Sequence, residues 1–311
     1  MTFDRARMVR ELREGLSEQP RRIPPKYFYD EHGSHLFDEI TRLPEYYPTR
    51  AERELLIRWS TTLVGIVKPR TLVELGAGSS DKTRTILDEM LRAAPNDVTY
   101  IPVDVSAGFL AQSAAQLRSE YPSLRIAPVA ADFSSHFALP EHPSPALHAF
   151  LGSTIGNFTP DDAVGLVSSV RERMEPGDYF LLGVDLRKDP TLIESAYNDS
   201  RGITAQFNRN MLSVINECLG ANFNLPAFDH SAIYNEREHR IEMRLIARGE
   251  QSVVIPDVGD FTFADGDWIL TEVSYKYDRN LANNVLARSE LVLREWFTDD
   301  AGLFALALSS R

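Results

Sequence analysis

The most constraining feature of this sequence is a regular alternation of short apolar runs with longer amphipathic segments. The apolar runs cover residues 71–75, 99–103, 126–130, 147–151 and 179–184. Helical patterning covers residues 82–93, 108–121 and 160–174. Strands that are connected by helices pair in parallel and carry the helices on both faces of the sheet. The alternation therefore predicts an α/β fold with a doubly wound sheet.

The segments on either side of this alternation have a different character. Before it we expect helices at 4–16 and 49–67, a proline-rich extended connection at 19–26, and an irregular, aromatic-rich wall at 27–48. After Asp185 we expect a helical region at 191–219 and strands at 240–247, 252–255 and 268–273. The runs 291–298 and 303–309 predict an antiparallel hairpin that completes the sheet edge.

This change of pattern predicts two domains, each built from two separate parts of the chain. Residues 51–187 and 277–311 are expected to form a domain around the doubly wound sheet. Residues 1–50 and 188–276 are expected to form a second α+β domain that covers the substrate.

Composition and charge narrow the class of protein. The 311 residues include 33 Lys and Arg against 45 Asp and Glu, a net charge of −12, and no basic run, which argues against a nucleic acid partner. The charged N-terminal segment and the short apolar runs predict a cytoplasmic protein without a membrane segment. We expect a monomer, because no exposed apolar stripe is evident.

Cysteine and histidine usage gives no indication of a metal site. Cys218 is the only cysteine, so neither a disulfide framework nor a thiolate cluster is expected, and a small buried side chain is the simplest interpretation. The seven histidines show no metal-ligand spacing, and His32 and His35 are expected in a turn.

The segment from Thr71 to Thr83 predicts a strand, a tight turn and a helix start. Gly76 and Gly78 allow a sharp turn and a close approach of a ligand to the backbone. A dinucleotide fingerprint would have a third glycine at position 81, where Asp81 stands. This departure favours S-adenosylmethionine, with an NAD-type enzyme as the alternative.

Ligands of open α/β sheets bind beyond the carboxyl ends of the strands, and four strand ends here carry suitable residues. Lys82 follows the glycine turn, and Asp104 can accept hydrogen bonds from both ribose hydroxyls. The pair Asp132-Phe133 offers an acceptor and a ring face for adenine. The segment Leu151 to Asn157 comes where the methionine part of the cofactor and the methyl acceptor must meet. Taken singly, each residue also has a purely structural interpretation, as a turn, cap or core residue.

At this point the sequence resembles the L-histidine Nα-methyltransferases of ergothioneine biosynthesis over nearly its whole length. Five segments carry the resemblance: Pro24-Pro-Lys-Tyr-Phe-Tyr-Asp30, Leu43-Pro-Glu-Tyr-Tyr-Pro-Thr-Arg50, Leu151-Gly-Ser-Thr-Ile-Gly-Asn-Phe-Thr159, Phe207-Asn-Arg-Asn210 and Thr271-Glu-Val-Ser-Tyr-Lys276. The resemblance implies a class I methyltransferase fold, S-adenosylmethionine as the cofactor, and conversion of histidine to its trimethylbetaine, hercynine.

The resemblance also implies the residues of the site. The cofactor would be bound by Tyr29, Gly76, Gly78, Lys82, Asp104, Asp132 and Phe133. Histidine would be bound by Phe37, Tyr46, Gly152, Thr154, Asn157, Tyr197, Met243, Glu272 and Ser274.

The chemistry of these side chains suits the implied roles. Asn157 and the Tyr197 hydroxyl can donate to the substrate carboxylate and thereby place the α-nitrogen. Glu272 and Ser274 would share one face of a strand and bind both imidazole nitrogens. Tyr46 and Met243 would pack on the imidazole. The alternative for Asn157 is a role in shaping the turn before Pro160, and for Glu272 it is a solvated strand position.

Methyl transfer is a displacement at an activated carbon, so the enzyme has to supply alignment and a deprotonated amine and needs neither a nucleophilic side chain nor a metal. Tyr29 is the candidate to contact that amine, through water, and Asn157 is the second catalytic candidate. Two further functions remain open: methylation of another amino acid by a relative of this family, and non-catalytic sensing of S-adenosylmethionine or histidine.

Overall fold

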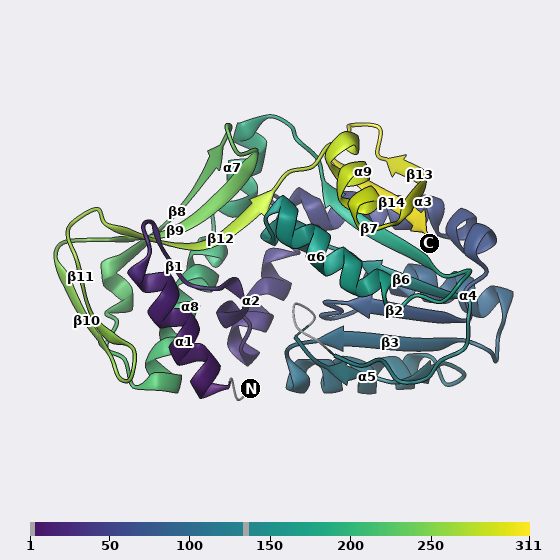
Figure 1. Ribbon diagram of the computed structural model, residues 1–311, viewed down its shortest axis with the longest axis horizontal. Coiled ribbons are helices and arrows are strands. Elements are labelled where there is room, and N and C mark those ends of the chain that lie inside the picture. Colours follow the sequence, from purple (N-terminus) through teal and green to yellow (C-terminus); the bar gives the residue numbers. More distant parts are fainter. Residues whose placement is uncertain (1–3, 133–136) are drawn as a thin grey trace. The chain divides into compact units, whose positions relative to one another are not determined.

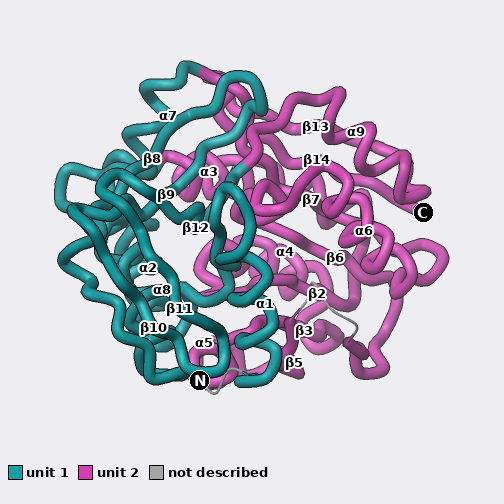
Figure 2. Tube along the Cα trace, turned by 60° about the vertical axis from the view of Figure 1, so that its left-hand side comes forward, with its two compact units in different colours: residues 1–46, 189–274 teal, residues 47–188, 275–311 magenta. Residues whose placement is uncertain are grey.

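The structure, a computed structural model, describes residues 4–132 and 137–311. The chain forms two compact units, which Figure 2 shows in different colours. Unit 1 comprises Met1–Tyr46 and Asp189–Ser274, and unit 2 comprises Tyr47–Lys188 and Tyr275–Arg311. Each unit therefore combines two parts of the chain that are far apart in the sequence.

Unit 2 contains the doubly wound sheet that the alternation predicts. Its strands run in the order β13-β14-β7-β6-β2-β3-β4, and β5 also pairs with β3. The bounds are β2 Thr71–Leu75, β3 Thr99–Asp104, β4 Arg125–Ile126, β5 Val129–Ala130, β6 Ala146–Phe150, β7 Tyr179–Asp185, β13 Val292–Thr298 and β14 Phe304–Ser310. Strands β2 to β7 pair in parallel, whereas β14 is antiparallel to β7 and to β13. The expected class I methyltransferase sheet and its C-terminal hairpin are confirmed.

Helices cover both faces of this sheet, with α6 and α9 in front of it and α3 and α4 behind it in Figure 1. Their bounds are α3 Tyr47–Val67, α4 Arg84–Ala93, α5 Ala107–Glu120, η2 Thr154–Asn157, α6 Pro160–Arg171 and α9 Arg279–Arg288. One core cluster joins α3 and α4 to the strands through buried side chains such as Leu55, Ile86 and Leu147. Because the central strands are buried on both faces, they consist of nearly continuous apolar runs.

Unit 1 is an α+β unit with a four-stranded sheet in the order β1-β12-β9-β8 and a separate hairpin of β10 and β11. The strands are β1 Arg21–Arg22, β8 Phe228–Asn235, β9 Arg240–Ala247, β10 Gln251–Ile255, β11 Gly259–Phe263 and β12 Trp268–Tyr275. The helices are α1 Arg5–Ser17, η1 Pro25–Phe28, α2 Glu31–Ile40, α7 Pro190–Tyr197, α8 Ile203–Leu219 and η3 Leu225–Ala227.

Five expectations about local structure were wrong in detail. The aromatic-rich segment contains the regular helix α2, which begins where Asp30 accepts a hydrogen bond from the Gly33 amide at 2.7 Å. His32 and His35 therefore lie in a helix and not in a turn. The helical region 191–219 is two helices, because Gly202 adopts a left-handed conformation between them. The strand at 126–130 is divided into β4 and β5 around Pro128, which has no amide hydrogen. Cys218 is exposed rather than buried.

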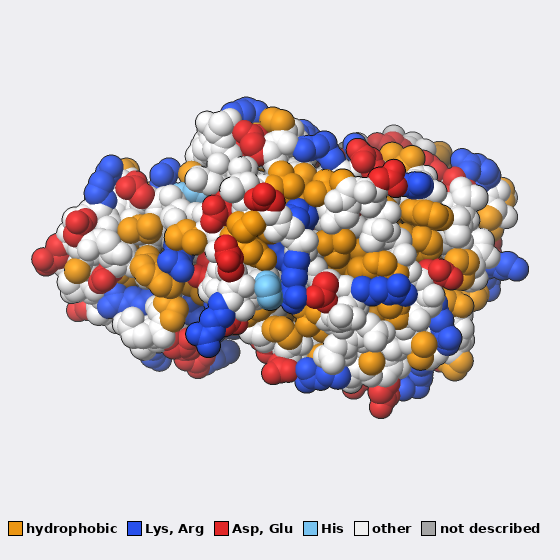
Figure 3. Space-filling model, turned by 90° about the horizontal axis from the view of Figure 1, so that it is seen from above, with side chains coloured by type: hydrophobic (Ala, Val, Ile, Leu, Met, Phe, Trp, Pro, Cys, Tyr) orange, Lys and Arg blue, Asp and Glu red, His pale blue; other side chains and the backbone are white. Residues whose placement is uncertain are grey.

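On the face of the molecule in Figure 3, Lys and Arg side chains are interspersed with Asp and Glu side chains and do not gather into a basic surface. Within residues 4–132 and 137–311, no helix is long and apolar enough to cross a membrane. The same part of the chain contains no group of three His, Cys, Asp or Glu side chains placed to hold a metal ion.

Candidate active site

The turn that follows β2 in unit 2 is fastened to the end of β3. The Gly76 amide donates to the Val103 carbonyl at 2.8 Å, and the Gly78 amide donates to the Asp104 carboxylate at 3.0 Å. Both glycines have positive φ angles, 67° and 51°, a conformation that other residues rarely adopt. A Cβ built on Gly78 would meet no atom within 4 Å, so the space beside this backbone is open to a ligand.

Asp104 is held for binding by its backbone surroundings. One carboxylate oxygen accepts from Gly78, and the other accepts from the Ser106 amide at 2.9 Å. Each oxygen can accept more than one hydrogen bond, so each retains capacity for a ligand hydroxyl. Burial raises the pKa of the Asp104 carboxyl, while the hydrogen bonds from these amides lower it.

The backbone just before Asp132 is joined to Asp104, because the Ala131 amide donates to the Asp104 carbonyl at 3.0 Å. Phe133 lies outside the described residues.

Glu74, near the end of β2, is a buried residue that stabilises the loop between β2 and α4. It accepts hydrogen bonds from the Thr83 hydroxyl at 2.5 Å, just before α4, and from the Tyr100 hydroxyl of β3. Its burial raises the pKa of the Glu74 carboxyl to about 7, while Thr83, Tyr100 and Lys82 oppose the shift. Glu74 therefore connects β2, β3 and α4 rather than facing a ligand.

The raised pKa of Glu74 predicts a pH dependence of stability. Below about pH 4.5 the group is protonated in both the folded and the unfolded state, so it imposes no penalty. Between about pH 4.5 and pH 7 the unfolded state has lost this proton while the folded state still holds it, so the free energy of unfolding falls by up to about 3 kcal/mol and then levels off. Glu74→Gln is expected to remove this fall. The free energy of unfolding of the variant, measured in urea, should therefore rise relative to that of the wild type between pH 5 and pH 8. A difference in stability that is constant over this range would contradict the assignment.

Glu52 of α3 is a functional candidate that the sequence reasoning missed. Its fully buried carboxylate accepts a hydrogen bond from the Gly152 amide at 2.7 Å and pairs with the Lys82 ammonium. It thus joins a residue implied for the cofactor to one implied for histidine. In the sequence, Glu52 is only a charged residue next to the apolar face of a predicted helix. Such residues are too common for this pattern to single out Glu52 as functional.

Gly183 in β7 provides the space for Glu52. A Cβ at this position would lie 2.2 Å from the Glu52 Oε1 atom and 3.3 Å from the Phe304 ring. We therefore expect Gly183→Ala to displace a buried carboxylate and lower the free energy of unfolding by about 1–3 kcal/mol. Gly165→Ala in α6 is the control, because its Cβ would meet nothing within 4 Å and should stabilise the helix by about 0.5–1 kcal/mol. Equal unfolding midpoints for the two variants in urea would refute this role of Gly183.

The segment after β6 forms the short helix η2. Gly152 and Ser153 have positive φ angles, and the Thr154 hydroxyl donates to the Leu151 carbonyl at 3.0 Å. Asn157 ends this helix with a half-buried side chain. Among the described residues, the Asn157 side chain makes no hydrogen bond within the turn.

In unit 1, four of the implied ligands form one row of aromatic rings. Ring centroids lie 5.7 Å apart for Tyr29 and Phe37, 6.3 Å for Phe37 and Tyr46, and 6.0 Å for Tyr46 and Tyr197, all with edge-to-face geometry. Phe207 of α8 packs against Tyr29 and Phe37 at 5.5 and 5.8 Å. The structure thus brings together implied ligands that are up to 168 positions apart in the sequence.

Asn210 of α8 fixes the first part of this row. Its side-chain amide donates to the Phe28 carbonyl at 3.2 Å and to the Asp30 carboxylate at 2.8 Å. A Cβ on Gly33 would lie 1.7 Å from the Phe28 carbonyl oxygen, so only glycine permits this close contact between η1 and α2. These contacts join the segments 24–30 and 207–210, both of which carry the resemblance.

His230 of β8 fixes the other end of the row. Its Nε2 atom lies 2.8 Å from the Tyr197 carbonyl, and its Nδ1 atom lies 2.8 Å from the Asn208 side-chain amide. Because the carbonyl requires a donor and the amide NH₂ requires an acceptor, His230 is the neutral Nε2–H tautomer. Burial lowers the pKa of His230, which favours this neutral form.

The remaining implied ligands lie on neighbouring strands of the unit 1 sheet. Glu272 and Ser274 are two positions apart in β12, which is extended to Tyr275, so their buried side chains share one face as expected. Met243 lies on the adjacent strand β9, where its carbonyl accepts from the Thr271 hydroxyl at 3.0 Å.

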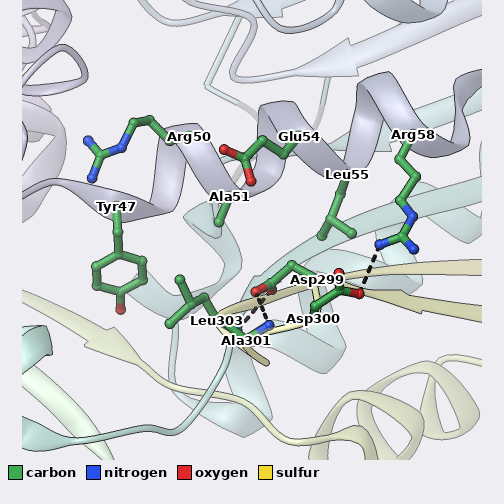
Figure 4. Close-up of a pocket in the computed structure, with 10 residues that line it drawn as sticks. All are labelled: Tyr47, Arg50, Ala51, Glu54, Leu55, Arg58, Asp299, Asp300, Ala301 and Leu303. Carbon is green, nitrogen blue, oxygen red and sulfur yellow. Dashed lines mark hydrogen bonds and ion pairs between the residues drawn. The ribbon is translucent and has the colours of Figure 1, made fainter.

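A pocket of about 320 Å³ in unit 2 contains none of the residues implied for the site (Figure 4). It lies between the first half of α3 and the loop that joins β13 to β14. The Asp299 carboxylate accepts from the backbone amides of its own loop, and Asp300 pairs with Arg58 at 3.0 Å. These contacts fix the loop between β13 and β14 and join it to α3.

Comparison with known proteins shows which family the chain resembles. A family model described as "Histidine-specific methyltransferase, SAM-dependent" matches residues 8–311. A histidine N-alpha-methyltransferase of Mycolicibacterium smegmatis is 46% identical over 97% of this chain and 94% of that protein. Ergothioneine biosynthesis protein 1 of Schizosaccharomyces pombe is 28% identical over 87% of this chain and 36% of that protein. An L-tryptophan methyltransferase of Psilocybe serbica is 27% identical over 94% of this chain and 90% of that protein.

The match extends over nearly the whole chain and includes both units, so it does not rest on the methyltransferase sheet alone. The chain therefore belongs to the family of S-adenosylmethionine-dependent, histidine-specific methyltransferases.

Proposed function

We propose that the protein transfers three methyl groups from S-adenosylmethionine to the α-nitrogen of L-histidine and so forms hercynine, the first step of ergothioneine biosynthesis. The observation that carries this proposal is the full-length similarity to a histidine N-alpha-methyltransferase. The aromatic row of unit 1 and the strand ends of unit 2 support it, because they supply the kinds of group that the two ligands require.

The cofactor residues fit S-adenosylmethionine. Asp104 has acceptor capacity for the two ribose hydroxyls, and the open backbone at Gly78 admits a ligand at close range. Tyr29, Gly76, Lys82, Asp132 and Phe133 complete the proposed cofactor set. When bound, the cofactor supplies a methyl group on a sulfonium, which is an electrophile that needs no further activation.

The histidine residues divide by the part of the substrate that they would bind. Asn157 and Tyr197 would donate to the carboxylate, while Glu272 and Ser274 would bind the imidazole nitrogens from one strand face. Phe37, Tyr46 and Met243 would supply apolar contacts, and Gly152 and Thr154 would contact histidine from the loop that also carries Asn157. Glu52 would act indirectly, by holding Gly152 and Lys82 in place.

The protein's catalytic contribution would be alignment and control of a proton. The substrate ammonium must lose a proton before each transfer, and the nitrogen must keep its lone pair directed at the methyl carbon. Tyr29 is the proposed contact for this amine, through water. Its ring is fixed by Phe37 and Phe207, which limits the directions that its hydroxyl can take.

Release of S-adenosylhomocysteine in the presence of each of the twenty amino acids tests this proposal. With limiting histidine and excess cofactor we expect three equivalents of S-adenosylhomocysteine per histidine, and only background with the other amino acids. Binding of both ligands without turnover would instead identify a sensor.

A second candidate function is methylation of another amino acid. The similarity to an L-tryptophan methyltransferase favours this candidate over a non-catalytic sensor. The two candidate activities predict different acceptors in the same assay. If another amino acid is methylated, Glu272 would need a different role, whereas the cofactor residues would keep theirs.

We further propose that most cofactor contacts come from unit 2, that most histidine contacts come from unit 1, and that the protein is a cytoplasmic monomer without a nucleic acid partner. The net charge of −12 and the interspersed charges of Figure 3 support the last point. Light scattering at micromolar concentration would reveal a dimer if the monomer proposal is wrong.

A further inference from the structure

The chain passes between unit 1 and unit 2 at three places, after Tyr46, after Lys188 and after Ser274. Close to each of these places, a side chain of unit 2 contacts the same carboxylate, that of Asp185. The Tyr47 hydroxyl donates to it at 2.8 and 3.0 Å, the Lys276 ammonium lies 2.8 Å from it, and the Lys188 ammonium pairs with its other oxygen. One residue thus holds all three connections.

The Asp185 cluster, which consists of Tyr47, Asp185, Lys188 and Lys276, is buried. Asp185 and Lys276 are fully buried, and the side chain of Lys188 is 8% exposed. Two ammonium groups face one carboxylate in this environment, and burial lowers the pKa of Lys188 to about 8. The Lys188 ammonium also donates to the Tyr47 hydroxyl at 2.8 Å and lies 4.4 Å from the centre of its ring.

A buried ionic cluster of this kind is a poor source of stability, because desolvation of its charges offsets their attraction. The Asp185 cluster instead favours one conformation of the chain, because its buried charges are paired only in that conformation. The significance of the Asp185 cluster therefore lies in the segments that it fixes in space.

The backbone around Asp185 shows the same convergence. The Tyr277 amide donates to the Asp185 carbonyl at 2.8 Å, and the Arg187 amide donates to the Tyr277 carbonyl at 2.9 Å. The Asp185 amide donates to the Ser153 hydroxyl at 2.8 Å. Ser153 lies between Gly152 and Thr154, two residues proposed to contact histidine.

We propose that Asp185 is a positioning residue for histidine binding. By holding Tyr47, Lys276 and Ser153, it fixes the chain next to Tyr46, Ser274, Gly152 and Thr154, which are proposed histidine contacts. The proposed cofactor residue Asp104 is instead held by the amides of Gly78 and Ser106. The predicted effect on histidine binding rests on the proposed function. The contacts by which Asp185 holds the three chain connections do not depend on it.

Tyr47→Phe is the sharpest test, because it removes only the hydroxyl that donates to Asp185 and accepts from Lys188. Tyr121→Phe is the matched control, since Tyr121 also donates to an aspartate, Asp88 at 2.9 Å, at the end of α5. We expect Tyr47→Phe to weaken histidine binding at least tenfold in calorimetric titration and to leave S-adenosylmethionine binding within twofold. Tyr121→Phe should change neither constant. Equal effects of the two variants, or an equal loss of cofactor affinity in Tyr47→Phe, would overturn the proposal.

Hydrogen exchange of the protein without ligands tests, independently of the substrate, whether Asp185 holds the chain connections in place. In Tyr47→Phe we expect the amides of Arg187 and Tyr277 to exchange at least ten times faster than in the wild type, with the amides of β2 unchanged. Unchanged exchange at both positions would overturn the proposal. If the wild type does not bind histidine, the proposed function fails, and the exchange result alone decides whether Asp185 holds the connections.

Discussion

Asp104→Ala is expected to weaken the binding of S-adenosylmethionine roughly 100-fold, because it removes the acceptor for both ribose hydroxyls. A hydrogen bond to a charged group contributes about 1.5–3 kcal/mol, so the loss of two such bonds exceeds about 3 kcal/mol. The substitution also removes the acceptor of the Gly78 and Ser106 amides, and this loosens the glycine turn. Calorimetric titration with S-adenosylmethionine measures the effect directly.

Asp81→Ala provides the control for this experiment. Asp81 lies in the same loop, but its side chain is 46% exposed and pairs with Arg84 on the surface. Exposed ion pairs contribute about 0–1 kcal/mol, so this variant should bind the cofactor almost as the wild type does. A normal dissociation constant for Asp104→Ala would remove Asp104 from the cofactor site.

Glu272→Ala is expected to weaken histidine binding by about 10- to 100-fold and to leave cofactor affinity unchanged. The physical reason is the loss of a buried acceptor for an imidazole N–H, which is worth about 1.5–3 kcal/mol when the acceptor is charged. The vacated apolar surroundings should also let aromatic amino acids without an imidazole compete better. Competition between histidine and phenylalanine or tryptophan, followed by product formation, measures this change in selectivity.

Glu238→Ala is the matched control for Glu272→Ala, because Glu238 is an exposed glutamate of unit 1 in the turn between β8 and β9. It should leave both histidine affinity and selectivity unchanged. If selectivity is also unchanged in Glu272→Ala, the carboxylate does not bind the imidazole.

The sheet could be predicted from the sequence because its signals are local. A buried parallel strand is an apolar run, and a connecting helix has its own periodicity, so both can be recognised without knowing any distant contact. The same reasoning predicts that Asp104 lies near the glycine turn, since carboxyl ends of parallel strands meet at one edge. The hydrogen bond from Gly78 to Asp104 confirms that proximity, while the role of Asp104 toward the cofactor stays a prediction.

The elements and residues that were missed depend on contacts between distant parts of the chain. Helix α2 is stabilised at its start by Asp30, which is visible in the sequence, but also by Asn210 from α8, which is not. Glu52 becomes a functional candidate only through its contacts with Lys82 and Gly152, which lie far from it in the sequence. Among the described residues, the three side chains that contact the Asp185 carboxylate come from positions 47, 188 and 276, and no local pattern connects them.

The measurement that tests the central claim most directly is tandem mass spectrometry of the product formed from histidine and S-adenosylmethionine with a deuterated methyl group. The account predicts that histidine gains three labelled methyl groups and that fragmentation releases fully labelled trimethylamine, which places all three on the α-nitrogen. Label on the imidazole ring, or labelled product only from another amino acid, would contradict it.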